Sequence, residues 1–366
     1  MSTTGSGGLS GRPLRRLAVP RFALECGAVL HDLTQAYHLD GALERGGRNL
    51  VLAFHALTGN ADAAGPETGW WRDVVGPGRA VDTGRYAVLC PNLLGSCYGT
   101  AWRAAEWDGV VTQRRDAPAP PITTRDQARF AALLVESLGV PLDAGALALV
   151  AGGSLGGMVA LEWAATYPDS ARAVAALAAP AAHPAWAVAW NHLQRRALDL
   201  AGPGREGAGL ALAREIAMLS YRTAGEFDAR FGRARAEGVY AVERYLDRHG
   251  ERLVARFDAG AYRTLLGAMD AHDVGRGRGG VGRALRRFAG RLVAVGVPGD
   301  VLYADDVVRA WADEAGARYH EVRSAVGHDA FLVEGARVGA VLAAVLDEVA
   351  DEARPAAAAP LEEVFL

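Results

Sequence analysis

A serine flanked by glycines is the strongest candidate for chemistry in this sequence. Ser154 lies in Gly152–Gly157, which has the pattern G-x-S-x-G, between an apolar run at Ala146–Val150 and a helical pattern at Met158–Thr166. A tight turn between a strand and a helix exposes a serine hydroxyl at the end of a sheet, and only small residues fit beside the serine. We therefore predict that Ser154 is a nucleophile. The alternative is a glycine-rich βα turn or phosphate loop, and the lack of any lysine weakens the phosphate interpretation.

A serine nucleophile needs a base, and His328 is the histidine whose position fits best. It lies in the turn Ala325–Asp329, after a strand-like run at Arg318–Arg323 and before a helix that begins near Phe331. In enzymes whose nucleophilic serine lies on such a strand–turn–helix motif, the acid and then the histidine follow the serine along the chain. We predict that His328 is the base; the alternative is a surface-loop histidine.

The acid that orients the histidine should follow a strand between these two residues. Asp300 comes just after the apolar run Arg291–Val297, so its carboxylate can reach a histidine at the same sheet edge. Asp305 and Asp306 compete with it, but acids suit the first turn of the helix that starts there. We predict Asp300.

Two main-chain amides are candidates to stabilise an oxyanion. The amide of Leu155 follows the nucleophile at a helix N-terminus. The amide of Leu57 lies in the loop His55–Gly59 after the first central strand, where the second donor is expected. We expect a structural role for His55.

The elements that must position these residues alternate between strands and helices. Five apolar runs have the length and continuity of strands buried on both faces of a parallel sheet. These are Asn49–Leu57, Tyr86–Asn92, Ala146–Ser154, Ala171–Ala179 and Arg291–Val297. A capping box at Thr123–Asp126 opens a helix to Leu138, and Phe22–Leu43 suggests antiparallel edge strands. The pattern predicts an α/β fold with a doubly wound, mostly parallel sheet.

The chain divides into a core and an insertion. We expect flexible tails at residues 1–15 and 354–366, and one core built from residues 16–182 and 291–353. Residues 183–290 form the expected lid, because the stretch is helical, rich in Arg and Ala, and shows no clear strand.

Composition limits the function classes. The 366 residues carry a net charge of −3, and this gives no basic face for nucleic acid or an anionic membrane. Three cysteines without a CxxC pair do not predict a disulfide framework or a metal site. No membrane span or signal peptide is apparent, so we expect a cytoplasmic protein.

Many blocks resemble one family in their order along residues of about 20 to 350. They are His55–Gly59, Gly69–Trp71, Gly76–Gly78, Asp82–Thr83, Asn92–Gly99, Gly152–Met158, Ala160–Trp163, Ser220–Arg222, Arg230–Arg233, Met269–Asp270, His272–Asp273 and Gly327–Leu332. On these blocks the chain resembles the homoserine O-acetyltransferases, α/β-hydrolase-fold acyltransferases of methionine biosynthesis.

The resemblance implies roles for five residues. Ser154, Asp300 and His328 would form the triad, and Arg222 and Asp329 would contact the amino-acid acceptor. Arginine offers a planar fork to a carboxylate and aspartate pairs with an ammonium, which agrees with those roles. The expected reaction moves an acetyl group from acetyl-CoA to L-homoserine through an acyl-serine. We expect that the reaction needs no metal or bound cofactor. We also expect that the protein is a homodimer.

Two stretches depart from the family pattern and leave the acceptor open. Ala101–Trp107 replaces a usual Thr-Gly-Pro segment, and Asp199–Gly209 is shorter than usual and lacks aromatic residues. The alternatives are therefore L-serine or another hydroxyl acceptor, a succinyl-CoA donor, a plain esterase, and a binding protein without activity.

Overall fold

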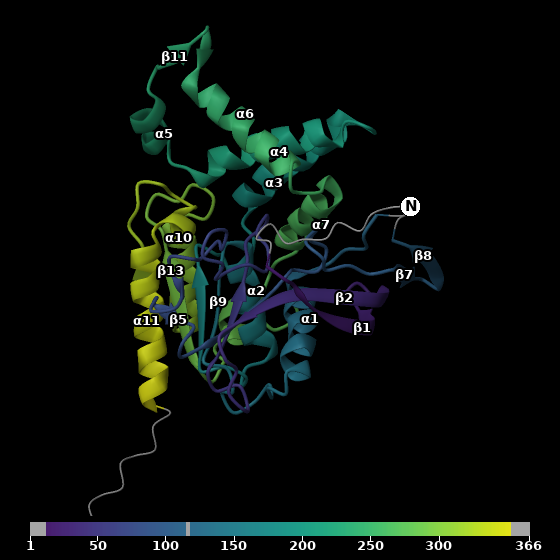
Figure 1. The fold of residues 1–366 in the computed structure, drawn as a ribbon, viewed down its shortest axis with the longest axis vertical. Coiled ribbons are helices and arrows are strands. Elements are labelled where there is room, and N and C mark those ends of the chain that lie inside the picture. Colours follow the sequence, from purple (N-terminus) through teal and green to yellow (C-terminus); the bar gives the residue numbers. More distant parts are fainter. Residues whose placement is uncertain (1–11, 115–117, 353–366) are drawn as a thin grey trace, which may run out of the picture.

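A ten-stranded sheet forms the centre of the molecule (Figure 1). The computed structural model describes residues 12–114 and 118–352. The strand order is β14-β13-β10-β9-β3-β6-β2-β7-β8, with β1 paired to β2. The strands are β1 Arg15–Ala23, β2 Val29–Asp40, β3 Leu50–Phe54, β6 Ala87–Pro91, β7 Ala104–Trp107, β8 Val110–Gln113, β9 Leu149–Gly153, β10 Ala173–Leu177, β13 Arg291–Gly296 and β14 Arg318–Glu321.

The strands from β14 to β6 are parallel and those from β2 outward are antiparallel. Each of the five apolar runs forms one of the parallel strands, and β3, β6, β9 and β10 are buried at every residue. This explains their uninterrupted apolar sequence, because helices or loops cover both faces of the sheet. The hairpin β7–β8 was not expected; its first strand, β7, lies in the stretch Ala101–Trp107 that departs from the family pattern.

Helices lie on both faces of the sheet. On one face, α1 (Thr124–Ser137), α2 (Leu155–Thr166), α8 (Val281–Leu285) and α9 (Asp305–Ala315) share an apolar core with the strands. The other face is covered by α11 (Gly335–Glu352), after the short α10 (Ala330–Val333), and by the loop that holds β4 (Val75–Gly76) and β5 (Val81–Asp82). The predicted capping box is present, since Thr123 and Asp126 bond each other's main-chain amides.

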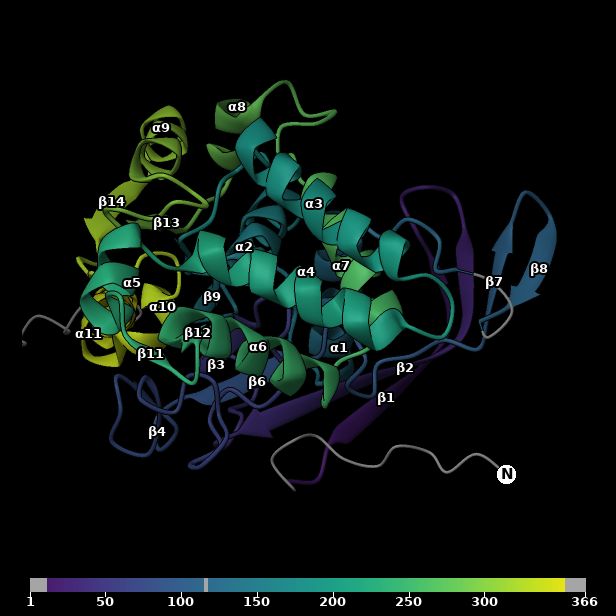
Figure 2. The ribbon, with the colours of Figure 1, turned by 90° about the horizontal axis from the view of Figure 1, so that it is seen from above.

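A group of helices covers the carboxyl ends of the parallel strands (Figures 1 and 2). They lie between β10 and β13 in the sequence, within residues 183–290. They are α3 (Ala185–Ala201), α4 (Glu206–Tyr221), α5 (Ala224–Phe231), α6 (Ala241–Val254) and α7 (Ala259–Asp270). We call residues 183–290 the lid, although α8, at its end, packs with α2 and α9 of the core.

The expectation that the lid has no strand was wrong at one place. β11 (Arg235–Ala236) and β12 (Val239–Tyr240) are strands of two residues each and form a hairpin. Glu237 and Gly238 form its turn with φ of 56° and 81°, as a type I′ hairpin turn requires. Strands of two residues leave no period in the sequence, and glutamate is an unusual residue for this turn.

The described chain begins before the first strand. Arg12 forms ion pairs with Asp40 and Asp62, and β1 begins at Arg15. Residues 1–11 of the expected first tail, and all of the expected tail 354–366, lie outside the described residues. Among the helices that the structure describes, none combines the length and apolar character that crossing a membrane needs.

Candidate active site

The turn that holds Ser154 is strained and tightly packed. β9 ends at Gly153, α2 begins at Leu155, and Ser154 between them has φ 55° and ψ −124°, which few non-glycine residues adopt. A Cβ on Gly156 would lie 2.1 Å from the carbonyl oxygen of Phe54 in β3. A Cβ on Gly152 would lie 2.4 Å from the main chain of Gly156. The crossing of α2 over β3 therefore requires both glycines of the G-x-S-x-G pattern.

The structure brings Ser154, His328 and Asp300 into one line of hydrogen bonds. His328 Nε2 lies 2.9 Å from Ser154 Oγ, and His328 Nδ1 lies 2.7 Å from Asp300 Oδ2. All three side chains are buried. This is the geometry in which an imidazole can take the serine proton while a carboxylate fixes its tautomer.

Both oxygens of the Asp300 carboxylate are engaged. Oδ2 faces His328, and Oδ1 accepts hydrogen bonds from the amides of Leu302 at 2.8 Å and Tyr303 at 3.0 Å. Asp305 instead accepts a hydrogen bond from the Tyr319 hydroxyl, and Asp306 is exposed, both in the first turn of α9. Among the described residues, Asp300 is therefore the carboxylate that bonds His328.

Aromatic rings and two carboxylates set the properties of His328. The rings of Tyr221, Tyr303 and Phe331 lie 5.5, 5.2 and 5.7 Å from its ring. Burial alone would lower the pKa of His328, but the charge and hydrogen bond of Asp300, together with the charge of Asp329, outweigh it, so the pKa lies above its usual value. The site therefore favours the imidazolium that forms when the serine is deprotonated.

The amides of Leu57 and Leu155 are free to bind an oxyanion. Within residues 12–114 and 118–352, neither amide donates to a protein acceptor. His55 accepts a hydrogen bond from the Leu93 amide at 3.1 Å, and burial lowers its pKa to about 4. It is a neutral residue that holds the loop 55–59, in line with the structural role expected of it.

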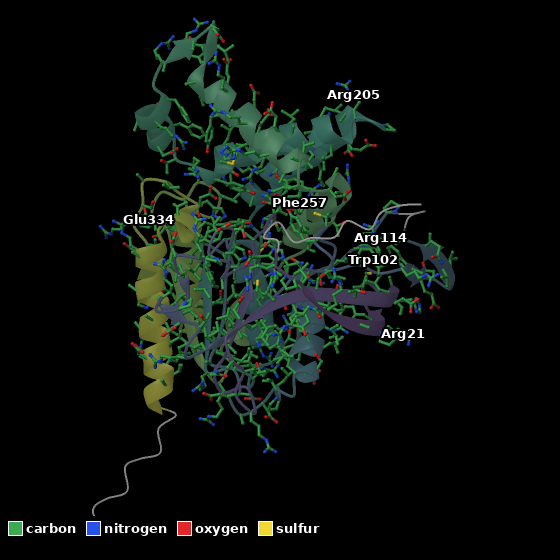
Figure 3. The ribbon with its side chains drawn as sticks, viewed as in Figure 1. Arg21, Trp102, Arg114, Arg205, Phe257 and Glu334 are labelled. Carbon is green, nitrogen blue, oxygen red and sulfur yellow. The ribbon has the colours of Figure 1, made fainter. Side chains whose placement is uncertain are left out.

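An arginine from the lid also holds the loop 55–59. Arg256 Nη1 donates to the Thr58 carbonyl at 2.7 Å and to the Tyr98 hydroxyl at 2.6 Å. The next residue, Phe257, lies at the junction of lid and core (Figure 3), 5.5 Å from the Tyr98 ring. Arg256 was not predicted to have a role, since no local feature of the sequence links it to a loop almost two hundred residues earlier.

Arg222 and Asp329 meet beside the triad, where the lid touches the core. Their side chains form an ion pair at 3.0 Å, and Asp329 follows His328 in the chain. The lid segment Tyr221–Thr223 lies along residues 325–329, with Thr223 bonded to the Val326 carbonyl at 3.2 Å and the Asp329 amide bonded to the Tyr221 carbonyl at 3.3 Å. Both residues that the resemblance assigned to the acceptor therefore lie at one place.

A second set of contacts links the loop that holds Asp300 to the lid, and the sequence did not predict it. The Tyr303 hydroxyl lies 3.0 Å from His183 Nε2, and His183 Nδ1 lies 3.3 Å from Asp270 at the end of α7. The Trp186 indole donates to the Val301 carbonyl at 2.7 Å. Within the described residues, no group of three His, Cys, Asp or Glu side chains could hold a metal ion.

The fold and the site define an enzyme of the α/β-hydrolase class, and residues 49–202 match the model of the alpha/beta hydrolase fold family. The chain is 43% identical over 360 residues to the homoserine O-acetyltransferase of Thermus thermophilus, covering 92% of each chain. It is 42% identical over 351 residues to that of Thermobifida fusca, covering 88% of this chain and 90% of the relative.

Solved structures agree with this relation. The homoserine O-acetyltransferase of Staphylococcus aureus is 28% identical with a TM-score of 0.76, over 92% of this chain and 95% of that one. The enzyme of Bacillus anthracis, at 20% identity, shares the fold with a TM-score of 0.81, over 92% and 97%. The chain belongs to the homoserine O-acetyltransferase family, as its sequence blocks predicted, and it is an O-acyltransferase.

Proposed function

We propose that this enzyme moves the acetyl group of acetyl-CoA to the side-chain hydroxyl of L-homoserine through an acyl-enzyme on Ser154. The observation that carries the proposal is the hydrogen-bonded line Ser154–His328–Asp300 in a chain 43% identical to a homoserine O-acetyltransferase. The product belongs to methionine biosynthesis.

In the first half-reaction, His328 Nε2 accepts the proton of Ser154 as Oγ attacks the thioester carbonyl. The amides of Leu57 and Leu155 stabilise the oxyanion of the tetrahedral intermediate. The C–S bond then breaks, and the thiolate leaves with the proton that His328 carries. Asp300 stabilises the imidazolium between these two proton transfers.

In the second half-reaction, the acceptor hydroxyl gives its proton to His328 and its oxygen attacks the acyl-serine. The same amides hold the second oxyanion, and collapse of the intermediate returns the proton to Ser154 Oγ. Arg222 binds the acceptor's carboxylate and Asp329 its ammonium. These steps use only groups of this chain, with acetyl-CoA as co-substrate.

The lid favours transfer over hydrolysis in this proposal. It covers the carboxyl ends of the strands (Figure 1), and Ser154, Asp300 and His328 are all buried. Limited access of water to the acyl-serine protects it until the acceptor arrives.

The experiment follows the two half-reactions separately. Mixing the protein with acetyl-CoA alone should release one equivalent of thiol and add one acetyl group to the intact mass. Ser154→Ala should abolish both. Adding L-homoserine should then remove the adduct and start steady turnover, faster than with L-serine or with succinyl-CoA as donor. Rapid loss of the adduct in water alone would indicate an esterase instead, and an adduct that persists in Ser154→Ala would place the nucleophile elsewhere.

A further inference from the structure

Three buried polar atoms without hydrogen-bond partners lie together in the lid. They are Arg222 Nε, Glu226 Oε2 and Tyr245 Oη, and none has a partner in the part of the chain that the structure describes. A buried polar atom left unpaired costs about 1–3 kcal/mol. Three such atoms at one place therefore indicate that something else, a ligand or water, completes the group.

Direct contacts show that the three side chains form one cluster. Arg230 joins Glu226 and Tyr245, since its Nη1 lies 3.4 Å from Glu226 Oε1 and its guanidinium carbon lies 4.8 Å from the centre of the Tyr245 ring. Arg222 Nη1 lies 3.9 Å from the same Glu226 oxygen. Phe227, next to Glu226, packs edge to face against Tyr245 with ring centres 5.9 Å apart.

The cluster lies beside the reacting groups. Arg222 Nη2 is 3.0 Å from Asp329, the residue after His328. Tyr221, the residue before Arg222, places its ring 5.5 Å from the ring of His328. A small molecule held by the cluster can therefore present another part of itself to His328 and Ser154.

The unpaired atoms specify the chemistry of the ligand. Arg222 Nε can only donate a hydrogen bond and suits a carboxylate, whereas Glu226 Oε2 can only accept one and suits an ammonium. Tyr245 Oη can do either. The ion pairs of the cluster join the cations Arg222 and Arg230 to the anions Glu226 and Asp329, so the cluster offers groups of both signs to a ligand that carries both charges. A phosphate would satisfy Arg222 and be repelled by Glu226.

We infer that this cluster binds the zwitterionic head of an α-amino-acid acceptor, with Glu226 and Tyr245 as specificity-determining residues. Glu226 holds the ammonium together with Asp329, and Tyr245 donates to the carboxylate alongside Arg222. The inference rests on the proposed function and names two residues to which neither the family relation nor the sequence assigned a role.

The test combines variants of the cluster with acceptors that lack one charge. Glu226→Gln should lower kcat/KM for L-homoserine by about 10- to 150-fold, the scale of a hydrogen bond to a charged group. Its thiol release from acetyl-CoA alone should stay within a few-fold of the native rate. With 4-hydroxybutanoate, which lacks the ammonium, the variant should lose little beyond what the native enzyme has already lost, because interacting groups are not additive.

Tyr245→Phe tests the second residue independently. It should lower kcat/KM for L-homoserine by about 10- to 150-fold, the scale of a hydrogen bond to a charged group, and should lose little further with 3-aminopropan-1-ol, which lacks the carboxylate. Glu237→Gln and Tyr240→Phe are matched controls in the same lid, since the Glu237 side chain is 90% exposed and the Tyr240 hydroxyl bonds the exposed Arg233. Both controls should stay within twofold of native. If Glu226→Gln does not fold, the Tyr245→Phe cycle decides the inference.

The outcomes separate the inference from the proposed function. A native enzyme that forms no acetyl adduct, or does not transfer the group to any amino acid, overturns the proposed function before a variant is made. A native enzyme that prefers L-serine overturns only the named acceptor, and the same cycle is then run with 3-hydroxypropanoate and 2-aminoethanol. With transfer intact, three results overturn the inference. If kcat/KM of Glu226→Gln equals that of Glu237→Gln, water fills the cluster, and additive losses for a variant and its matching acceptor analogue would show that the two groups do not interact. If Glu226→Gln instead slows thiol release from acetyl-CoA, the cluster binds coenzyme A.

Discussion

Replacing Asp300 by asparagine should disable the base without changing the shape of the site. In the native protein, Oδ1 accepts from the amides of Leu302 and Tyr303 and Oδ2 faces His328 Nδ1 at 2.7 Å. If the oxygen of the new amide keeps the two main-chain bonds, its NH₂ group must face His328. The imidazole then accepts at Nδ1 and carries its proton on Nε2, so it cannot take the proton of Ser154.

The size of the effect follows from the alternative orientation of the amide. Turning the oxygen toward His328 restores the working tautomer, but it places the NH₂ group against two main-chain amides. Two buried donors then lose their acceptor, at about 1–3 kcal/mol each. The productive orientation is therefore disfavoured by about 2–6 kcal/mol, so turnover should fall by roughly 30- to 20,000-fold. The loss of the carboxylate charge adds to this.

The assay for Asp300→Asn is steady-state turnover with acetyl-CoA and L-homoserine as a function of pH. Activity requires neutral His328, whose pKa is raised because the attraction of Asp300 exceeds the opposing effect of burial. Removing the carboxylate leaves burial opposed only by the charge of Asp329, so the acidic limb of the pH profile should move to lower pH as the maximum falls. The control is Asp306→Asn, an exposed carboxylate in α9 that should stay within a few-fold of native. Activity of Asp300→Asn within tenfold of native, or an equal loss in Asp306→Asn, would refute this account of the acid.

Three further predictions test other parts of the structure. Gly156→Ala would place a Cβ 2.1 Å from a main-chain oxygen of β3, so the thermal midpoint of this variant should fall by about 5 °C or more. The control is Gly267→Ala, whose new Cβ would have nothing within 4 Å, and its midpoint should not fall. Equal midpoints for the two variants would contradict the packing argument. Arg256→Ala should slow thiol release from acetyl-CoA by about tenfold, because the loop 55–59 loses its hydrogen bonds to the lid. Added guanidinium should restore part of the rate, and an unchanged rate in the variant would show that Arg256 does not support the site. Burial lowers the pKa of His55 to about 4 and that of His272 to about 3, so their contribution to stability is complete above pH of about 6.5 and is lost as pH falls toward those values. Urea unfolding should therefore show a smaller free energy at pH 5 than at pH 7, and a rise toward pH 5 would contradict this.

The sequence by itself determined the features that depend on neighbours in the chain. The apolar runs became the buried parallel strands, and the Thr123 capping box formed as expected. The turn around Ser154 was predictable because its glycines are a local steric requirement of the strand–turn–helix geometry. Asp300 and His328 followed from their places just after strands, since the carboxyl ends of parallel strands meet at one edge of a sheet.

Only the tertiary structure decided how the lid meets the core. Arg222 and Asp329 came from family blocks, and their 3.0 Å contact exists because the segment after α4 packs along the loop that holds His328. Arg256, Glu226 and Tyr245 carry no local signal, because nothing in the neighbouring sequence distinguishes them from the lid's other arginines, glutamates and tyrosines. Their importance comes from partners found or missing in space, and burial and hydrogen bonding across distant segments are settled only when the chain has folded.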